Sequence, residues 1–164
     1  MFASPQADSI TIRRAAQDDL PALVGIDPLA QSNAARRQFI RTTLAHRQCF
    51  VVTTGDEVAG LVVLRHDFFD QGFIPLVLVG AAHRRQGLAL RLLAAAEAKC
   101  RTEKLFASTN ASNTAAQALL ERAGFVRSGV VENLDAQDPE WVYFKPVGRP
   151  RAPAAIEQRK ARRD

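Results

Sequence analysis

Cysteine is scarce in this sequence, and long apolar runs and a leader-like start are missing. The 164 residues contain two cysteines, Cys49 and Cys100, in separate apolar stretches. This pattern excludes a disulfide framework and a cysteine-based metal cluster, so we expect two buried thiols and no metal site. No apolar run reaches the roughly 18 residues of a membrane-spanning helix, and the first residues lack the segments of a signal peptide. We therefore expect a cytoplasmic protein without a membrane partner.

The positive charge is unevenly placed along the chain. The formal net charge is +5, yet residues 148–164 alone hold six basic and two acidic residues. This segment has no aromatic residue on which a base could stack, so we expect no nucleic-acid partner beyond a salt-sensitive phosphate contact. Its prolines and low apolar content predict a flexible basic tail.

Residues 1–147 have the length and composition of one folded domain, since 47% of the chain is hydrophobic. Asp18 and Asn33 are expected to cap the first two helices, which Asp27-Pro28 separates. The element order predicts a single α/β domain, with a mixed seven-stranded sheet, mostly antiparallel in its first half, and four flanking helices. The strands are expected at residues 9–15, 49–54, 58–65, 73–79, 105–109, 125–132 and 141–146, and the two later helices at 87–100 and 115–123.

A basic, glycine-containing turn connects the apolar strand at 73–79 to the long helix that follows. A helix N-terminus carries unpaired backbone N–H groups and the positive end of the helix dipole, which together bind phosphate. Gly87 allows a close backbone approach and Ala89 is small, while Arg84 and Arg85 can pair with phosphate oxygens. This segment therefore predicts a phosphate-binding loop.

Two motifs resemble those of the GNAT acetyltransferase superfamily. Arg84, Gly87 and Ala89 match the pyrophosphate loop Arg/Gln-x-x-Gly-x-Gly/Ala. The block from Asn113 to Phe125 is similar to the family's Asn-x-x-Ala-x-x-Leu-Tyr-x-x-x-Gly-Phe. The element order agrees as well, and the resemblance covers residues 10–147.

The resemblance implies acetyl-CoA as the cosubstrate, bound where the fourth and fifth strands separate. Its pantetheine arm would pair with the backbone of the fourth strand, and an N–H near Leu78 or Val79 would polarise the thioester carbonyl. Asn113 would hydrogen-bond the same arm, although it is equally suited to capping a helix. The implied cofactor-binding residues are Val77, Leu78, Val79, Arg84, Arg85, Gln86, Gly87, Leu88, Ala89 and Asn113.

The sequence departs from the family at both positions that often supply acid–base catalysis. Leu120 stands where the family often has a tyrosine that protonates the leaving thiolate, and leucine cannot donate a proton. We interpret the single tyrosine, Tyr143, as structural. The fourth strand lacks the glutamate base of many relatives. Glu132 is the favoured candidate for a base, ahead of His66 and Asp67.

The acceptor site implied by the resemblance lies between residues 27–33 and 132–141. The second segment contains the acids Glu132, Asp135, Asp138 and Glu140, which would attract a cationic amine, although a solvated polar loop explains them as well. We place Trp141 in the core rather than in the wall of a pocket.

The sequence thus predicts an N-acetyltransferase that moves the acetyl group of acetyl-CoA to a primary amine, of a small molecule or a protein, by direct attack. The missing tyrosine and glutamate motivate an alternative, a CoA-binding sensor or scaffold with weak or no catalysis. A nucleic-acid-associated module that uses the basic tail is a third reading. The sequence leaves open whether the protein forms a homodimer.

Overall fold

The computed structural model describes residues 9–148. Seven strands form one sheet, accompanied by five α-helices and two 3-10 turns. The strands are β1 (Ile10–Arg14), β2 (Cys49–Thr54), β3 (Glu57–Phe68), β4 (Gln71–Val79), β5 (Lys104–Asn110), β6 (Val126–Val131) and β7 (Glu140–Pro146). The helical elements are η1 (Gln17–Asp19), α1 (Leu20–Ile26), α2 (Pro28–Ser32), α3 (Ala34–Ala45), η2 (Ala81–His83), α4 (Leu88–Lys99) and α5 (Thr114–Arg122).

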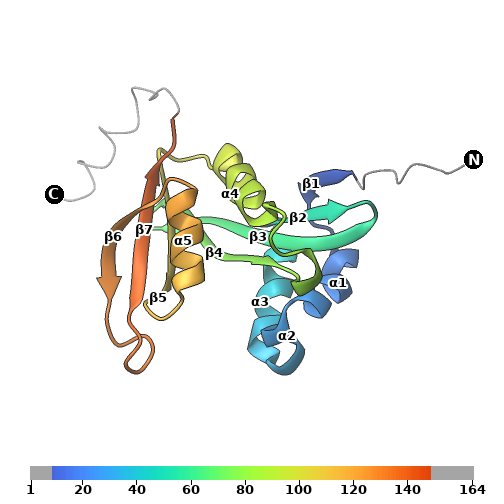
Figure 1. Ribbon diagram of the computed structural model, residues 1–164, viewed down its shortest axis with the longest axis horizontal. Coiled ribbons are helices and arrows are strands. Elements are labelled where there is room, and N and C mark those ends of the chain that lie inside the picture. The colour runs from blue at the N-terminus through green and yellow to red at the C-terminus, as the bar shows by residue number, and fades with distance from the viewer. Residues whose placement is uncertain (1–8, 149–164) are drawn as a thin grey trace, which may run out of the picture.

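The sheet has the order β1-β2-β3-β4-β5-β7-β6, which confirms the predicted mixed sheet. Neighbouring strands are antiparallel except for β4 and β5, which run parallel. The parallel pair requires a crossover, and α4 supplies it. Figure 1 shows the two halves of the sheet, β1 to β4 and β5 to β6, running in clearly different directions.

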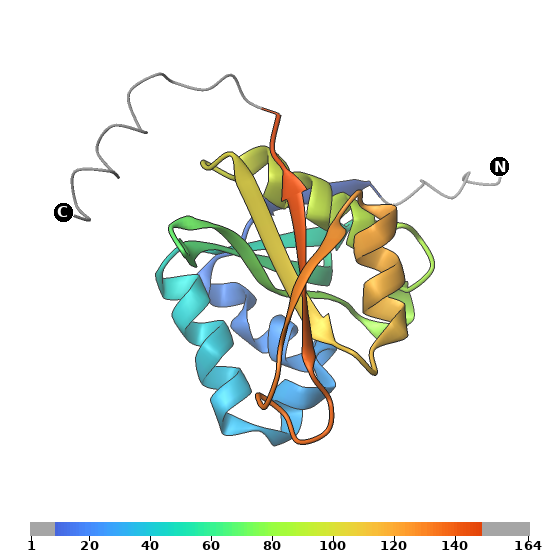
Figure 2. The same ribbon diagram turned by 90° about the vertical axis from the view of Figure 1, so that its left-hand side faces the viewer.

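Two hydrophobic clusters cover the two faces of the first half of the sheet. On β2, Val51 packs with the residues of α1–α3, whereas the next residue, Val52, packs with those of α4. Both are fully buried, because successive side chains of a strand point to opposite faces. In Figure 1, α4 lies above this half of the sheet and α1–α3 lie below it; Figure 2 shows α5 beside the second half.

The expected four helices become five because Asp27-Pro28 starts a helix as well as ending one. The Asp27 carboxylate accepts a hydrogen bond from the N–H of Leu29 at 3.0 Å and forms an ion pair with Arg36 at 2.8 Å. Proline suits the first position of a helix, since its missing N–H would have no partner there. The short α2 therefore fits between α1 and α3, and Asn33 caps α3 as predicted.

The predicted cap of the first helix by Asp18 is wrong. A 3-10 turn precedes α1, and the acid that organises it is Asp19. Its carboxylate accepts a hydrogen bond from the N–H of Ala16 at 2.7 Å and two from the guanidinium of Arg13 at 2.8 Å. This pairing with Arg13 is the first cause that lowers the pKa of Asp19.

Helix α4 begins at Leu88, one residue later than expected, with Gly87 as its cap. Leu88 is buried in the core, whereas Ala89 is only half-buried. Cys49 and Cys100 are both free and buried, as predicted, and burial raises the pKa of Cys49 to about 12.

The end of β7 closes the described part of the domain. Val147 is buried in the cluster beneath α4 and α5, and its N–H donates a 2.8 Å hydrogen bond to the carbonyl of Glu103. The expected tail, 148–164, lies outside the described residues except for Gly148. Among the described residues, no helix combines the length and apolar character that crossing a membrane requires.

Candidate functional site

The central feature of the sheet is a gap between β4 and β5. These strands pair over three residues only, and the last pair is Ile74 with Ala107. The next residue of β4 is Pro75, which has no N–H to offer a neighbouring strand. Beyond this point β4 runs on as far as Val79 with β3 as its only paired neighbour.

A β-bulge bends β4 where it leaves β5. Val63 of β3 pairs with Leu76, and Arg65 pairs with Phe73, so β3 advances two residues while β4 advances three. The extra residue of β4 lies at Ile74–Pro75, and such bulges bend and twist a strand locally. The bulge and the end of the parallel pairing therefore coincide, and together they open the gap.

The backbone of β4 that faces the gap belongs to Val77 and Val79. The N–H of Gly80 donates a 2.8 Å hydrogen bond to the carbonyl of Ala59, which continues the antiparallel ladder with β3. In such a ladder the N–H and C=O of one residue point to the same side, and the side alternates along the strand. The backbone N–H and C=O of Leu78 therefore face β3. Of the three strand residues predicted to pair with the cofactor, Val77 and Val79 are the ones whose backbone groups face the gap.

The loop after β4 presents backbone N–H groups at the start of α4. Arg85 (φ 62°) and Gly87 (φ 71°) both have left-handed backbones. Gly87 caps α4 without a side chain, so the first N–H groups of the helix receive no side-chain acceptor from the cap. A Cβ on Gly87 would meet no protein atom within 4 Å, so within the protein it is the positive φ that calls for glycine here.

The basic side chains of this loop are exposed. Arg84, Arg85 and Gln86 all face solvent, and neither arginine takes part in an ion pair within residues 9–148. Two guanidinium groups thus stand beside the uncapped helix start, as a phosphate site requires.

His83 anchors the loop, a role that no pattern in the sequence indicated. Its Nδ1 lies 3.5 Å from the hydroxyl of Thr54, and its Nε2 lies 3.2 Å from Oε1 of Glu57, an ion-pair distance without hydrogen-bond alignment. Both partners lie at the β2–β3 turn, about thirty residues earlier in the chain. Only the tertiary fold brings them to the loop.

Asn113 caps α5, as one of its two predicted roles requires. Its side-chain oxygen accepts a 3.1 Å hydrogen bond from the N–H of Ala116. The amide of Gln117 further holds this turn by donating to the carbonyls of Asn110 and Ala111. Asn113 itself is exposed.

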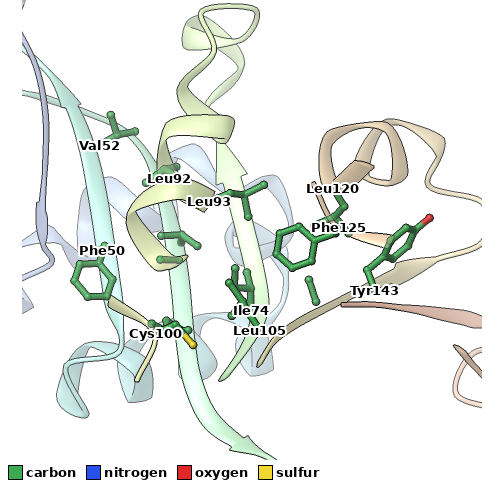
Figure 3. Packing of buried hydrophobic residues seen from close by; sticks show 14 of the residues in the cluster. Phe50, Val52, Ile74, Leu92, Leu93, Cys100, Leu105, Leu120, Phe125 and Tyr143 are labelled. Atoms are coloured by element: carbon green, nitrogen blue, oxygen red, sulfur yellow. The ribbon is translucent and has the colours of Figure 1, made fainter. Parts of the chain in front are cut away.

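Leu120 and Tyr143 belong to the same buried cluster (Figure 3). Leu120 is 4% exposed and Tyr143 is fully buried, with Phe125 beside them. The Tyr143 hydroxyl has no hydrogen-bond partner within residues 9–148, and burial raises its pKa. β5 lies between β7 and the gap, so Tyr143 is one strand removed from it.

The acidic β6–β7 loop is held by hydrogen bonds to the end of β5 and to the turn that follows it. Asp135 accepts a 2.8 Å hydrogen bond from the side-chain amide of Asn110. Asp138 accepts hydrogen bonds from the N–H and the hydroxyl of Ser112 at 2.9 and 2.6 Å. Glu132 is exposed and has no hydrogen bond or ion pair within the described chain. Two of the four acids thus serve to position the loop.

The two other predicted base candidates lie away from the loop of α4. The antiparallel register places Arg65 beside Phe73 and Gly60 beside Val79, so His66 and Asp67 lie near the start of β4. Nε2 of His66 accepts a 3.1 Å hydrogen bond from the N–H of Arg101, and Asp67 pairs with Arg65. Trp141 is partly buried against the core, as expected, with the guanidinium of Arg127 3.4 Å from its ring centroid.

A hollow of about 370 Å³ lies beside the paired starts of β4 and β5, ahead of the gap. Phe106 lines it, together with Phe68 and Val142. Leu105 and Ala107 pack toward α4 and α5, so Phe106 points to the opposite face, the side of α1–α3. Its ring centroid is 5.1 Å from that of Phe68, which stacks on Phe73 at 4.8 Å. The hollow therefore lies on the face away from α4, and its wall combines these rings with the polar side chains of Gln71, Lys104 and Ser128.

One family model, described as the acetyltransferase (GNAT) family, matches residues 11–125. A GNAT-family acetyltransferase from Bacillus cereus is 35% identical, with a TM-score of 0.80 over 86% of this chain and 99% of that one. No match was found among the curated proteins.

More distant solved structures share the fold. The ribosomal-protein-S18-alanine N-acetyltransferase of Escherichia coli is 21% identical, with a TM-score of 0.71 over 88% of this chain and 98% of that one. The Salmonella typhimurium protein yncA, solved with its cofactor acetyl-CoA, is 20% identical, with a TM-score of 0.71 over 90% of this chain and 99% of that one.

Proposed function

The chain belongs to the GNAT acetyltransferase family, and we propose that it transfers the acetyl group of acetyl-CoA to a primary amine by direct attack. The observation that carries this proposal is the gap between β4 and β5, which leads directly into the uncapped start of α4. A thioester in the gap and a pyrophosphate on the loop would lie along one continuous path of exposed backbone donors.

The loop residues suit a pyrophosphate. The N–H groups of Leu88 and Ala89 begin α4 at the positive end of its dipole, and the left-handed Arg85 and Gly87 turn the preceding backbone around them. Arg84 and Arg85 would add charge-assisted hydrogen bonds, with Gln86 as a neutral donor. Asn113, at the start of α5, would donate to the pantetheine arm of CoA with its side-chain amide nitrogen, since its side-chain oxygen already accepts from the N–H of Ala116.

The gap-facing backbone suits an acyl thioester. Acetyl-CoA supplies an activated acetyl group, which the attacking amine converts to an amide with release of the CoA thiol. The N–H of Val77 or Val79 would donate to the carbonyl oxygen as negative charge develops on it. Since β4 is held by β3 and bent by its bulge, these donors are positioned before the substrate arrives.

Side-chain acid–base chemistry plays a small part in this proposal. Leu120 cannot protonate the leaving thiolate, and Tyr143 is fully buried on β7, with β5 between β7 and the gap, so water would supply that proton. Glu132 is the proposed base; because its carboxylate is exposed, it would remove the amine proton through water. Holding the amine against the thioester would supply much of the rate.

We place the acceptor on the face of the sheet opposite α4. The hydrogen bonds to Asp135 and Asp138 come from neutral donors, so they hold these carboxylates in place and leave the negative charge of the β6–β7 loop to attract a cationic amine. The hollow beside Phe106, whose wall includes Phe68 and Val142, adds an apolar contact. We therefore expect a cationic amine that carries an apolar group to be preferred over one without such a group.

Thiol release from acetyl-CoA, measured with a panel of amines, tests the proposal. Phenethylamine and ethylamine form a matched pair that differs by the phenyl ring, and phenethylamine should have the lower KM. Phe106→Ala should reduce that difference without changing acetyl-CoA binding. A protein that binds acetyl-CoA yet acetylates no amine in the panel would contradict catalysis and favour the sensor or scaffold.

A further inference from the structure

A second hollow, of about 490 Å³, lies where α4 ends. Four basic side chains from separate segments converge on it. Arg14 comes from the end of β1, Arg47 from the turn after α3, Lys99 from the last residue of α4, and Arg101 from the connection to β5.

These four cations have no acidic partner among the described residues. The ion pairs there join other residues, and the one acid in the wall of the hollow, Asp67, pairs with Arg65. All four side chains are exposed to solvent, and like charges that line one hollow favour the binding of an anion. The hollow is therefore a positively charged site with more cations than acids in its wall.

Local contacts hold the lining of this hollow in place. The guanidinium of Arg14 donates to the carbonyl of Arg47 and lies 4.8 Å from the ring centroid of Phe50. Nε2 of His66 accepts the N–H of Arg101 at 3.1 Å, so the proton of the neutral ring is on Nδ1, which can donate to a ligand. Burial, followed by the charge of Arg101, lowers the pKa of His66 and thereby favours this neutral ring.

The hollow is distinct from the loop at the start of α4. Gly87 caps one end of the helix and Lys99 is the last residue at the other. Twelve residues at 1.5 Å per residue separate the two ends by about 18 Å. A pyrophosphate bound at Gly87 would therefore lie too far away to pair with these cations.

We propose that this hollow binds a compact anion with several negative charges on adjacent phosphate groups. Arginine forks and a lysine ammonium suit phosphate oxygens. The ring of Phe50 is 6% exposed and lies beside Arg14, so it offers no open face for stacking a base. Recognition therefore falls on the phosphates, whether inorganic or part of a nucleotide.

Calorimetric titration with tripolyphosphate, in the presence of saturating CoA to occupy the loop, tests this site. We expect one site whose affinity falls as salt is added. The double variant Lys99→Gln/Arg101→Gln should bind at least tenfold more weakly, because it loses two charge-assisted contacts. Arg41→Gln, which removes an exposed arginine of α3 that does not line the hollow, is the matched control and should bind like the wild type.

Several results would overturn the inference. They are the absence of binding heat, equal affinity in the double variant, or an equal loss in Arg41→Gln. Adenosine diphosphate and inorganic diphosphate, titrated in parallel, distinguish the two sources of the phosphates. A single-stranded RNA that binds tenfold more tightly than tripolyphosphate and depends on the same two residues would replace the small anion with a nucleic acid. Since the loop and the gap are untouched, these results are independent of acetyl transfer.

Discussion

Leu120 of α5 and Tyr143 of β7 are buried in one cluster, and the Tyr143 hydroxyl has no hydrogen-bond partner within the described chain. The family resemblance predicts a tyrosine at position 120, where this chain has leucine. Its tyrosine, Tyr143, lies on β7 instead, and β5 separates that strand from the gap. This arrangement has consequences for both residues.

Tyr143→Phe should leave turnover unchanged and leave stability equal or higher by up to about 1 kcal/mol. A buried hydroxyl without a partner costs desolvation free energy that phenylalanine does not. Urea denaturation and thiol release measure the two effects. Loss of turnover with intact acetyl-CoA binding would instead identify Tyr143 as the proton donor.

Leu120→Tyr should fold with a loss of about 1–3 kcal/mol, because the larger side chain overfills a packed core. Turnover should stay similar, or rise if the new hydroxyl reaches the thiolate, since general acid catalysis is worth about 10²–10⁴-fold. Steady-state thiol release checks this. A folded variant that binds acetyl-CoA but turns over far more slowly would contradict a water-mediated release.

Gly87→Glu should sharply weaken acetyl-CoA binding, because it places an anion beside the phosphate loop and forces a side chain into a left-handed backbone. Gly87→Ala isolates the backbone effect and should cost about 1 kcal/mol of stability. Gly25→Ala is the matched control, since that glycine lies in α1, is exposed and has open space around its Cβ. Calorimetry of acetyl-CoA binding reads the result; unchanged affinity in folded Gly87→Glu would exclude the loop assignment.

Cys49 should make stability fall on the alkaline side. Its pKa is raised from 9.0 to about 12 by burial, so the folded thiol stays neutral while the unfolded one ionises. The neutral Cys49 thiol makes its full contribution to the free energy of unfolding below pH 9. That contribution is lost between about pH 9 and 12, by up to about 1.4 kcal/mol per pH unit. Urea denaturation of the wild type and Cys49→Ala at pH 8 and 10.5 checks the sign. The advantage of the wild type should shrink at the higher pH; a constant difference would contradict it.

A chain that ends at Gly148 should melt within about 3 °C of the full-length protein and bind acetyl-CoA equally well. It keeps the buried Val147 and its hydrogen bond to Glu103, and the residues removed offer little apolar surface. A chain that ends at Lys145 is the control and should lose several degrees, since about 1 kcal/mol shifts the midpoint by about 2–4 °C. A collapse of the Gly148 transition would show that the basic segment packs on the domain.

Local chemistry let the sequence by itself predict the order of elements along the chain and the position of a candidate phosphate loop. The run from Val79 to Ala89 contains the strand end, the basic turn and the helix start within a few residues, so its pattern is readable without neighbours. Short apolar runs bounded by turn residues likewise predicted the strands. Helix ends were less secure: Asp18 and Asp19 are adjacent acids, and only the position of Arg13 on β1 decides which one organises the turn.

Tertiary structure decided whatever depends on residues that are far apart in the chain. The extra residue at Ile74–Pro75 becomes a bulge only through its pairing with β3, and the gap exists only because β5 stops following β4 there. Asp135 and Asp138 look like free acids until Asn110 and Ser112 are placed beside them. The four cations at the end of α4 span almost ninety positions, and no local pattern could bring them together. Their meeting is a property of the packed sheet and helices, because long-range contacts are set by the hydrophobic core rather than by neighbouring residues.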